Sequence, residues 1–537
     1  MNDDDDPCWT TAMRSPDREY WIAGAREELR NLADLQVFVL VPRSDVPRGR
    51  RPLKGKLVCK RKRDDTGKII RYKVHYVAKG YAQQYGLDYD KMTAPTARLK
   101  SFRTILHFAA THGWDIQQMD IKTAFLHGVL PDDETAYLEQ LQGFEEPGKE
   151  TWVMRLMKSI YGMKQAGRIW NQTFDSAVTK WGFEHVPSDW CVYRRDTDTG
   201  TVIFAVHVDD IFSIADPPEE NTRFKEQLHS KWEISDLGPA KFTLGIAIDC
   251  DLDRHTIGLS QVAFIDWLIE RFNLSDACPV DTPMIQGLQI RRPDKSLPAS
   301  PDLDDWVEAT HYRELVGSLN YIAVATRPDI SFAVGRLTSV LDCYRLEHWS
   351  AALRVLRYLK GTRTLHLVLG GLVTDTLTGF SDSDFANCPD TSCSIAGYCF
   401  SLGSGAISWR SKKQDNPIDS VCYAEYTALH GASKEAVFLR QLLQGLKLLP
   451  KQYLPMPLYC NNDAAVRIAE DSVLHSNTKH FRVKLHYVCD QVRMGELKIL
   501  RVPSADNVAD ILTKSLNYTA FDHLRLSLGL HATEVPT

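Results

Sequence analysis

Two adjacent aspartates, Asp209 and Asp210, stand between two apolar runs of β-strand character. The runs are Thr201–Val208 and Ile211–Ala215, and two strands separated by two residues are typical of a β-hairpin. Neighbouring side chains on a regular strand point to opposite faces, so adjacent carboxylates can share one site only where the chain turns. Two anions placed side by side need a counter-ion, which a divalent cation can supply. The pair therefore indicates either a metal-binding hairpin tip or a solvated turn.

A third carboxylate, Asp120, favours the metal-binding interpretation. It lies near the end of the strand-like segment Trp114–Ile121, far upstream of the aspartate pair. Three carboxylates without a neighbouring cluster of cysteine and histidine would form an oxygen-only site, which favours Mg²⁺ or Mn²⁺. Two such ions about 3.5–4 Å apart assist in-line phosphoryl transfer. The three aspartates are therefore candidates for a phosphoryl-transfer centre with two ions per active site.

Positive charge is concentrated in one stretch of the chain. Thirteen basic and two acidic residues lie between Arg48 and Lys79, although the whole chain has a formal net charge of −5. A basic stretch in an otherwise acidic chain indicates a local contact with a polyanion. A solvated basic hairpin and a nuclear import signal are the alternatives that the sequence leaves open.

The composition is that of an ordinary globular protein, with 44% hydrophobic and 25% charged residues in 537. No apolar run reaches the roughly 18 residues of a membrane span, and the acidic start of the chain is unlike a secretory signal. Twelve cysteines without a C-x-x-C pair indicate free thiols in a reducing compartment. We therefore expect an intracellular protein, cytoplasmic or nuclear, without a membrane partner.

Helices and strands must position these carboxylates. Residues 20–40, 100–113 and 348–359 have apolar positions at helical spacing. Residues 276–305 are rich in proline, aspartate and serine, which is typical of a linker. From Gly379 onward the pattern becomes strand, strand, helix, strand, helix, so a second structural unit is expected there.

A series of short motifs runs in one order along nearly the whole chain. They include QMDIKTAFLHG at 118–128, KSIYGMKQA at 158–166, VDD at 208–210, LVGSL at 315–319 and LRYLKGT at 356–362. In this order the motifs resemble the reverse transcriptase and RNase H portion of the Pol polyprotein of copia-type LTR retrotransposons. Each motif alone would be weak evidence, but the ordered series is specific.

The resemblance implies an α+β multidomain fold, in which a right-hand polymerase with fingers, palm and thumb is followed by an α/β RNase H-like domain. The expected boundaries are 1–35 for an N-terminal segment, 36–275 for the fingers and palm, 276–372 for a linker and helical thumb or connection, 373–517 for the RNase H-like domain and 518–537 for a C-terminal tail.

The resemblance also assigns the polymerase site. Asp120, Asp209 and Asp210 match the family's catalytic metal ligands. The family usually has an aromatic residue before the Val-Asp-Asp motif, whereas this chain has His207. A histidine can pack beside the primer end, but it adds a titratable group to the site.

Four further residues match substrate-binding positions of the family. Phe125 matches the steric gate that favours dNTPs over rNTPs, although a plain core aromatic is the alternative. Gln165 matches a glutamine near the nucleotide sugar. Lys73 and Lys79 are candidates for contact with the triphosphate, and the basic stretch around them could instead follow the template backbone.

A second acidic set resembles the metal ligands of the family's RNase H domain. The matching positions are Asp382, Glu425, Asn461 and Asp510. The family has aspartate where this chain has Asn461, so one negative charge is missing from a site that holds two dications. The sequence therefore predicts weak or absent RNase H activity.

The resemblance implies an RNA-directed DNA polymerase, a nucleotidyltransferase whose partners are an RNA template, a DNA primer, the RNA·DNA hybrid and dNTPs. The alternative is a catalytically inactive retrotransposon remnant that at most binds nucleic acid, because Asn461 shows that one site has drifted. A metal-dependent phosphatase is a third class, and the ordered motif series argues against it. The sequence makes no prediction about the oligomeric state.

Overall fold

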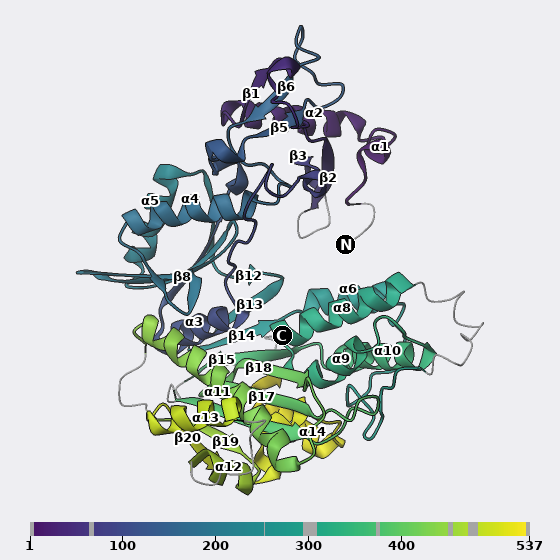
Figure 1. Ribbon diagram of the computed structural model, residues 1–537, viewed down its shortest axis with the longest axis vertical. Helices are drawn as coiled ribbons and strands as arrows, with labels where there is room; N and C mark the ends of the chain where they lie inside the picture. The colour runs from purple at the N-terminus through teal and green to yellow at the C-terminus, as the bar shows by residue number, and fades with distance from the viewer. Residues whose placement is uncertain are drawn as a thin grey trace.

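The computed structural model describes residues 5–63, 69–251, 253–293, 309–371, 376–448, 455–470 and 482–532. The chain is a mixed α/β protein with five β-sheets. Figure 1 shows the N-terminal part at the top, the helices α4 and α5 below it, and the C-terminal half at the bottom.

Two short sheets and two helices form the N-terminal part. The strands β2 and β3 pair as a hairpin, and β1, β6 and β5 form a three-stranded sheet. Buried Trp21 of α2 shares one apolar core with Val74 and Tyr76 of β3. The bounds are α1 Trp9–Ala12, α2 Arg18–Asp34, β1 Phe38–Val41, β2 Gly55–Arg63, β3 Ile69–Ala78, β5 Ala136–Glu139 and β6 Val153–Leu156.

The helix expected over residues 20–40 is too long at its C-terminal end. Helix α2 ends at Asp34, and Gln36 adopts a positive φ of 53°. The chain then forms β1, in which Phe38 pairs with Leu156 of β6. The apolar run after the turn forms a strand because it pairs with β6. This partner is distant in sequence, so the local pattern does not indicate the pairing.

A six-stranded sheet, here called the central sheet, has the order β11-β4-β10-β9-β8-β7. Helices α4 and α5 pack on one face of it, where Phe174 and Phe224 contact Phe204. Helix α3 packs on the other face, where the rings of Phe102 and Phe212 lie 4.9 Å apart. The bounds are α3 Leu99–His112, β4 Asp115–Ile121, α4 Ala166–Lys180, β7 Glu184–Val186, β8 Asp189–Thr197, β9 Gly200–His207, β10 Asp210–Asp216, α5 Glu219–Lys231 and β11 Ile234–Pro239.

A five-stranded antiparallel sheet, the connecting sheet, follows with the order β12-β13-β14-β15-β21. Strand β21 lies within the residues expected to form a C-terminal tail, yet it pairs with β15. Residues 518–532 are therefore part of the fold. The bounds are β12 Phe242–Thr243, β13 Ile246–Asp251, β14 Thr256–Ser260, α6 Val262–Arg271, α8 Ala309–Ala325, α9 Ser331–Thr338, α10 Leu346–Gly361, β15 Leu365–Gly370, α14 Tyr518–Ser527 and β21 Leu530–Ala532.

The last sheet, here called the C-terminal sheet, has the order β18-β17-β16-β19-β20. Its first three strands are antiparallel neighbours, and β19 and β20 run parallel to β16. Helix α11 packs on this sheet, and the 3₁₀ helix η9 carries Asp510. The bounds are β16 Leu377–Asp384, β17 Ile395–Leu402, β18 Gly405–Lys413, α11 Val421–Gly445, β19 Met456–Cys460, α12 Asp463–Glu470, α13 Arg482–Arg493, β20 Leu497–Arg501 and η9 Val508–Leu512.

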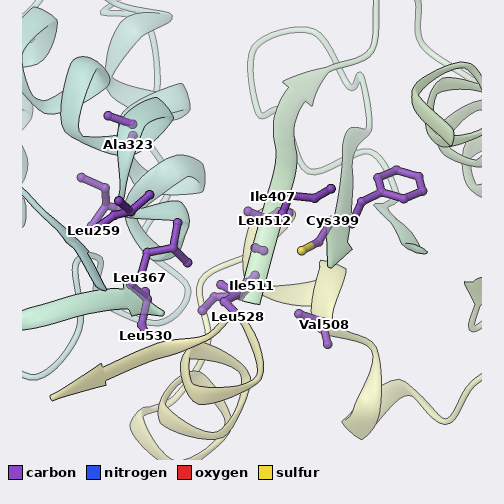
Figure 2. Close-up of a cluster of buried hydrophobic side chains, with 14 of the residues drawn as sticks. Leu259, Ala323, Leu367, Cys399, Ile407, Val508, Ile511, Leu512, Leu528 and Leu530 are labelled. Atoms are coloured by element: carbon purple, nitrogen blue, oxygen red, sulfur yellow. The ribbon is translucent and has the colours of Figure 1, made fainter. Parts of the chain in front are cut away.

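One continuous apolar core joins helix α3, the connecting sheet, the helices around it and the C-terminal sheet. Figure 2 shows part of this core, with Leu259 of β14 and Leu367 of β15 on one side and Ile407 of β18 on the other. Burial of shared apolar surface is the main force that holds such units together. In the described part of the chain, no helix is both long enough and apolar enough to cross a membrane.

Candidate functional site

The turn between β9 and β10 contains Asp209 but not Asp210, so it lies one residue earlier than expected. Strand β9 ends at His207 and β10 begins at Asp210, so the turn residues are Val208 and Asp209. Val208 adopts a positive φ of 63°, which is unusual for a β-branched residue. The indole Nε1 of Trp170 donates a hydrogen bond to the Val208 carbonyl at 2.6 Å. This bond from α4 helps to hold the turn.

The turn brings the three predicted aspartates to one end of the central sheet. Asp210 lies directly opposite Asp120 in the antiparallel pairing of β10 and β4, and such opposite residues share one face. The amide of Ile121 donates to the carbonyl of Asp209 at 2.9 Å. Asp120, Asp209 and Asp210 are the first acidic group.

Burial and mutual repulsion raise the pKa of two members of this group. Burial and the charges of Asp209 and Asp210 raise the pKa of Asp120 to about 6. Burial and Asp210 also raise the pKa of Asp209. Lys73 of β3 opposes both shifts, so this predicted residue acts electrostatically on the first acidic group.

The carboxylate of Asp210 already has two hydrogen-bond donors. Gln118 Nε2 donates to its Oδ1 at 2.9 Å, and Thr243 Oγ1 donates to its Oδ2 at 2.5 Å. Gln118 lies two residues before Asp120 on β4, and Thr243 ends β12. These bonds fix the orientation of the Asp210 carboxylate.

Phe125 lies half-buried beside Tyr161, whose role the sequence reasoning missed. The two ring centroids are 5.3 Å apart in an edge-on arrangement. Burial, Glu28, Asp209 and Asp120 all raise the pKa of Tyr161, so its hydroxyl senses the first acidic group. Tyr161 belongs to the KSIYGMKQA motif, but nothing in the motif indicates which side chain faces the acids.

A close backbone contact positions Tyr161. The amide of Ala78, at the end of β3, donates to the Tyr161 carbonyl at 2.8 Å. A Cβ atom at Gly162, whose φ is 87°, would lie 2.3 Å from the Ala78 carbonyl oxygen. Only glycine therefore allows the β2–β3 hairpin to approach this segment so closely.

Gln165 and Lys79 lie in other surroundings. Gln165 is completely buried, accepts from Gln83 Nε2 at 3.0 Å and donates to the Asp88 carbonyl at 2.8 Å. Its contact with a nucleotide sugar stays a prediction, because both ends of its amide are bonded within the protein. Lys79 lines a hollow of about 490 Å³ beside Arg51, and its contact with a triphosphate also stays a prediction.

The second acidic group consists of Asp382, Glu425 and Asp510. Asp382 is on β16, Glu425 is on α11, and Asn461 directly follows β19. Asn461 Nδ2 donates to Asp382 Oδ1 at 3.0 Å, and Thr513 Oγ1 donates to Asp382 Oδ2. An aspartate in place of Asn461 could not make this donation, so the amide changes the site from a pair of anions to a hydrogen bond.

A lysine lies among the second acidic group. Lys514 Nζ is 2.8 Å from Asp510 Oδ2, and Asp382, Asp510 and Asp384 raise the pKa of Lys514 against the opposing effect of burial. Burial, followed by Asp382 and Asp510, raises the pKa of Glu425 to about 9. Glu425 is therefore neutral at pH 7, and Lys514 supplies the positive charge within the group.

The two groups differ in how well they fit divalent cations. Within the described ranges, no set of three or more histidine, cysteine, aspartate or glutamate side chains is arranged to hold a metal ion. In the first group, Asp120 and Asp209 are oxygen donors whose repulsion a cation would relieve, so they fit one. In the second group, the Asn461 amide and the Lys514 ammonium face the carboxylates as donors, which disfavours a cation there.

The second group also contains three buried oxygen atoms without a hydrogen-bond partner, namely Glu425 Oε2, Asp510 Oδ1 and Asn461 Oδ1.

Comparisons with known proteins agree with the motif series. Residues 36–286 match the family described as "Reverse transcriptase (RNA-dependent DNA polymerase)". The chain is 36% identical, over 99% of its length, to the "Retrovirus-related Pol polyprotein from transposon TNT 1-94" of Nicotiana tabacum. It is 35% identical, over 89% of its length, to the corresponding polyprotein from transposon RE1 of Arabidopsis thaliana.

The share of each relative that is covered differs. The chain spans 39% of the tobacco polyprotein and 31% of the Arabidopsis polyprotein. A "Putative transposon Ty5-1 protein" of Saccharomyces cerevisiae is 31% identical over 55% of this chain, and 92% of that protein is covered.

Proposed function

Because the chain belongs to the reverse transcriptase family, among the Pol polyproteins of copia-type retrotransposons, we propose that it is an RNA-directed DNA polymerase that uses two-metal phosphoryl transfer. The observation that carries the proposal is the position of Asp210 opposite Asp120, with Asp209 in the adjoining turn. Three carboxylates from distant segments meet at one sheet end, and two of them have raised pKa values. Such a cost is typical of functional rather than structural carboxylates.

The proposal includes a right-hand polymerase architecture. In it, the N-terminal sheets are the fingers, the central sheet is the palm, and helices α8 to α10 with the connecting sheet are the thumb or connection. The C-terminal sheet, with three antiparallel strands and two parallel ones, is the RNase H-like domain. The basic β2–β3 hairpin supports this arrangement, because the charge of its residue Lys73 lowers the pKa of Asp120 on the central sheet.

Each residue of the first acidic group has a task in this proposal. Asp120 and Asp209 hold the metal ions, and Gln118 and Thr243 orient Asp210 beside them. Two Mg²⁺ or Mn²⁺ ions, when bound, supply a lowered pKa for the primer 3′-hydroxyl and charge stabilisation for the leaving pyrophosphate. Lys73 attracts the triphosphate, because its ammonium group is a flexible point charge near the carboxylates.

Phe125 is proposed as the gate that excludes ribonucleotides. Its ring is held by the edge-on contact with Tyr161, so it cannot easily swing aside to accommodate a 2′-hydroxyl. Gln165 and Lys79 keep proposed supporting roles, at the sugar and the triphosphate respectively. The role of Gln165 requires movement of the surrounding segments, because its side chain is enclosed.

The polymerase would act on an RNA template with a DNA primer and dNTPs, and would bind the resulting RNA·DNA hybrid. We also propose an intracellular location, cytoplasmic or nuclear, which the twelve free cysteines support. The second candidate function is an inactive remnant that at most binds nucleic acid. The hydrogen bond from Asn461 to Asp382 favours loss of activity at the second acidic group, and not at the first.

Primer extension separates the two functions. Purified chain is incubated with poly(rA)/oligo(dT), dTTP and Mg²⁺, in parallel with Asp209→Asn. We expect incorporation by the wild type, none by the variant, and loss of the signal when Mg²⁺ is chelated. Incorporation by neither protein, with retained binding of the template–primer, would establish the remnant.

We further propose that RNase H activity is impaired and that Asn461→Asp partly restores it. The substitution removes a donor to Asp382 and returns a carboxylate, so hybrid cleavage should rise at least about tenfold. Because the new carboxylate repels Asp382, the melting temperature of the variant should also rise with added Mg²⁺ more than that of the wild type.

Asn462→Asp is the matched control for this experiment. It makes the same charge change one residue later, where the side-chain oxygen accepts from the Ala465 amide at the start of α12. Cleavage of an RNA·DNA duplex and thermal melting are measured for all three proteins. Equal cleavage by wild type and Asn461→Asp would contradict the proposed impairment.

A further inference from the structure

A hollow of about 830 Å³ lies between strand β18, helix α11 and the start of helix α3. Figure 1 shows the three elements as neighbours in the lower half of the molecule. Strand β18 is the edge strand of the C-terminal sheet in the part of the chain that the structure describes. We call this hollow the basic groove.

The lining of the groove is strongly cationic. Six basic residues contribute to it, with two acidic residues, Asp415 and Glu435. The basic residues are Arg98, Lys100, Arg410, Lys412, Lys413 and Lys434. In a chain whose formal net charge is −5, such an excess of positive charge in one hollow calls for a negative partner.

The two acids of the groove already have partners. Glu435 pairs with Lys100 Nζ at 2.7 Å and accepts from Ser408 Oγ at 2.6 Å. Asp415 pairs with Lys412 Nζ at 2.8 Å. These pairs use two of the six cations and leave the other four without acidic partners in the lining.

The remaining cations make no ion pair with a carboxylate in the described part of the chain. They are Arg98, Arg410, Lys413 and Lys434. The Phe438 ring orients the Arg98 end of the groove, with the Arg98 guanidinium 4.6 Å and the Lys100 ammonium 3.9 Å from its centroid. Arg98 is therefore held in place by a ring and not by a structural counter-ion.

The spacing of the cations fits a chain of phosphates. Arg410 and Lys412 are two residues apart on one edge strand, so these two cations, of which Lys412 also pairs with Asp415, lie on the same face about 7 Å apart. The Phe438 ring of the lining already carries two cations, and the Tyr398 hydroxyl donates to Glu435 at 3.4 Å. The groove thus offers mainly positive charge, which suits a phosphate backbone.

We propose that the basic groove binds the phosphate backbone of a nucleic-acid strand, as a site additional to the first acidic group. The choice of nucleic acid among polyanions rests on the proposed function. The groove joins the start of α3, which packs on the central sheet, to the C-terminal sheet, so a bound strand would contact both.

The test compares two triple variants of the full chain. The groove variant carries Arg410→Ala, Lys413→Ala and Lys434→Ala. The control variant carries Arg26→Ala, Lys231→Ala and Lys498→Ala, which removes the same charges from exposed positions on α2, α5 and β20. Binding of a labelled RNA strand and of an RNA·DNA hybrid is measured without nucleotides across a range of salt concentrations, so the result does not depend on catalysis.

We expect the groove variant to bind the RNA strand at least about tenfold more weakly at low salt. The slope of log affinity against log salt should fall by about 2, since each lost phosphate contact on a single strand removes about 0.7. The control variant should match the wild type, and melting curves should show that all three proteins are folded.

A photoreactive residue at Asn416, in the groove lining, provides a second readout. It should crosslink to RNA, whereas the same residue at Asn517 should not. Unchanged salt slopes together with no crosslink would overturn the proposal. Loss of affinity for inorganic polyphosphate, with unchanged binding of RNA and hybrid, would also overturn it, because the groove would then be a small-anion site. If the chain crosslinks to RNA through the groove but fails primer extension, the result would support nucleic-acid binding by the groove and contradict the proposed polymerase activity.

Discussion

Asp120→Asn should abolish nearly all primer extension while making the protein more stable. The substitution removes a proposed metal ligand, so the rate of incorporation should fall at least about 100-fold. It also removes the charge that Asp209 and Asp210 repel. The pKa of Asp120 is raised to about 6, so the gain in unfolding free energy at pH 7.5 should be about 1 kcal/mol after allowance for solvent screening.

The sign of the pH dependence follows from the raised pKa. The folded protein holds the Asp120 proton up to about pH 6, whereas the unfolded chain releases it near the ordinary value of 3.8. The penalty therefore develops as pH rises from 3.8 to 6 and is complete above 6. The stability difference between Asp120→Asn and wild type should be largest at pH 7.5 and should shrink as pH falls through 6. Polymerase activity of the wild type should fall over the same range, since protonated Asp120 is a poor ligand.

Asp236→Asn is the control for both effects. Asp236 lies on β11 beside β4, and Lys225 and the Gly238 amide lower its pKa against the effect of burial. Its removal should leave activity near that of the wild type and should not increase stability. Urea unfolding at several pH values and primer extension provide the measurements. An active Asp120→Asn protein, or one less stable than the wild type at pH 7.5, would contradict the assignment.

Local patterns predicted the elements of the first site well, and long-range contacts account for the differences. The helix expected at 100–113 and the strand at 114–121 correspond to α3 and β4. The turn is displaced by one residue because Val208 adopts a positive φ, and its partner Trp170 comes from α4. No propensity favours valine there, so the shift could not be found from the sequence.

The second site shows a similar limit. The sequence indicated that Asn461 removes a negative charge from the site. It did not indicate the orientation of the side chain, whose amide group donates to Asp382 in the structure. The sequence did not assign Lys514 to this site, because its proximity to Asp510 depends on the turn of η9. The tail expected at 518–537 contains β21, whose apolar residues become a strand only through pairing with β15.

Arg103 provides the clearest example of a residue whose importance comes from tertiary contacts. It lies on α3 and is only 4% exposed. Its Nε donates to the Ile407 carbonyl of β18 at 2.7 Å, and its Nη1 donates to the carbonyls of Val324 and Ala325 at 3.0 and 2.9 Å. The guanidinium also lies 3.9 Å from the centroid of the Trp409 ring. One side chain thus joins the helix on the central sheet, the end of α8 and the C-terminal sheet.

Arg103→Met should lower the unfolding free energy by about 3–5 kcal/mol, because methionine fills the space but leaves the buried carbonyls of Ile407 and Ala325 without this donor. Arg103→Lys should lie between wild type and Arg103→Met. Lysine keeps one donor, but burial lowers the pKa of the Arg103 guanidinium and would also lower that of an ammonium in its place, and a single ammonium cannot reproduce the planar fork.

Urea unfolding and limited proteolysis measure the effect, with exposed Arg26→Met on α2 as the control. The control should unfold at the wild-type midpoint, whereas Arg103→Met should unfold at lower urea and release a C-terminal fragment more quickly. If the hydrogen bonds of Arg103 contributed nothing to stability, Arg103→Met and Arg26→Met would unfold at the same urea concentration. A shared midpoint would therefore mean that the apolar core of Figure 2 alone joins the C-terminal sheet to α3, and that the buried guanidinium contributes no net stability.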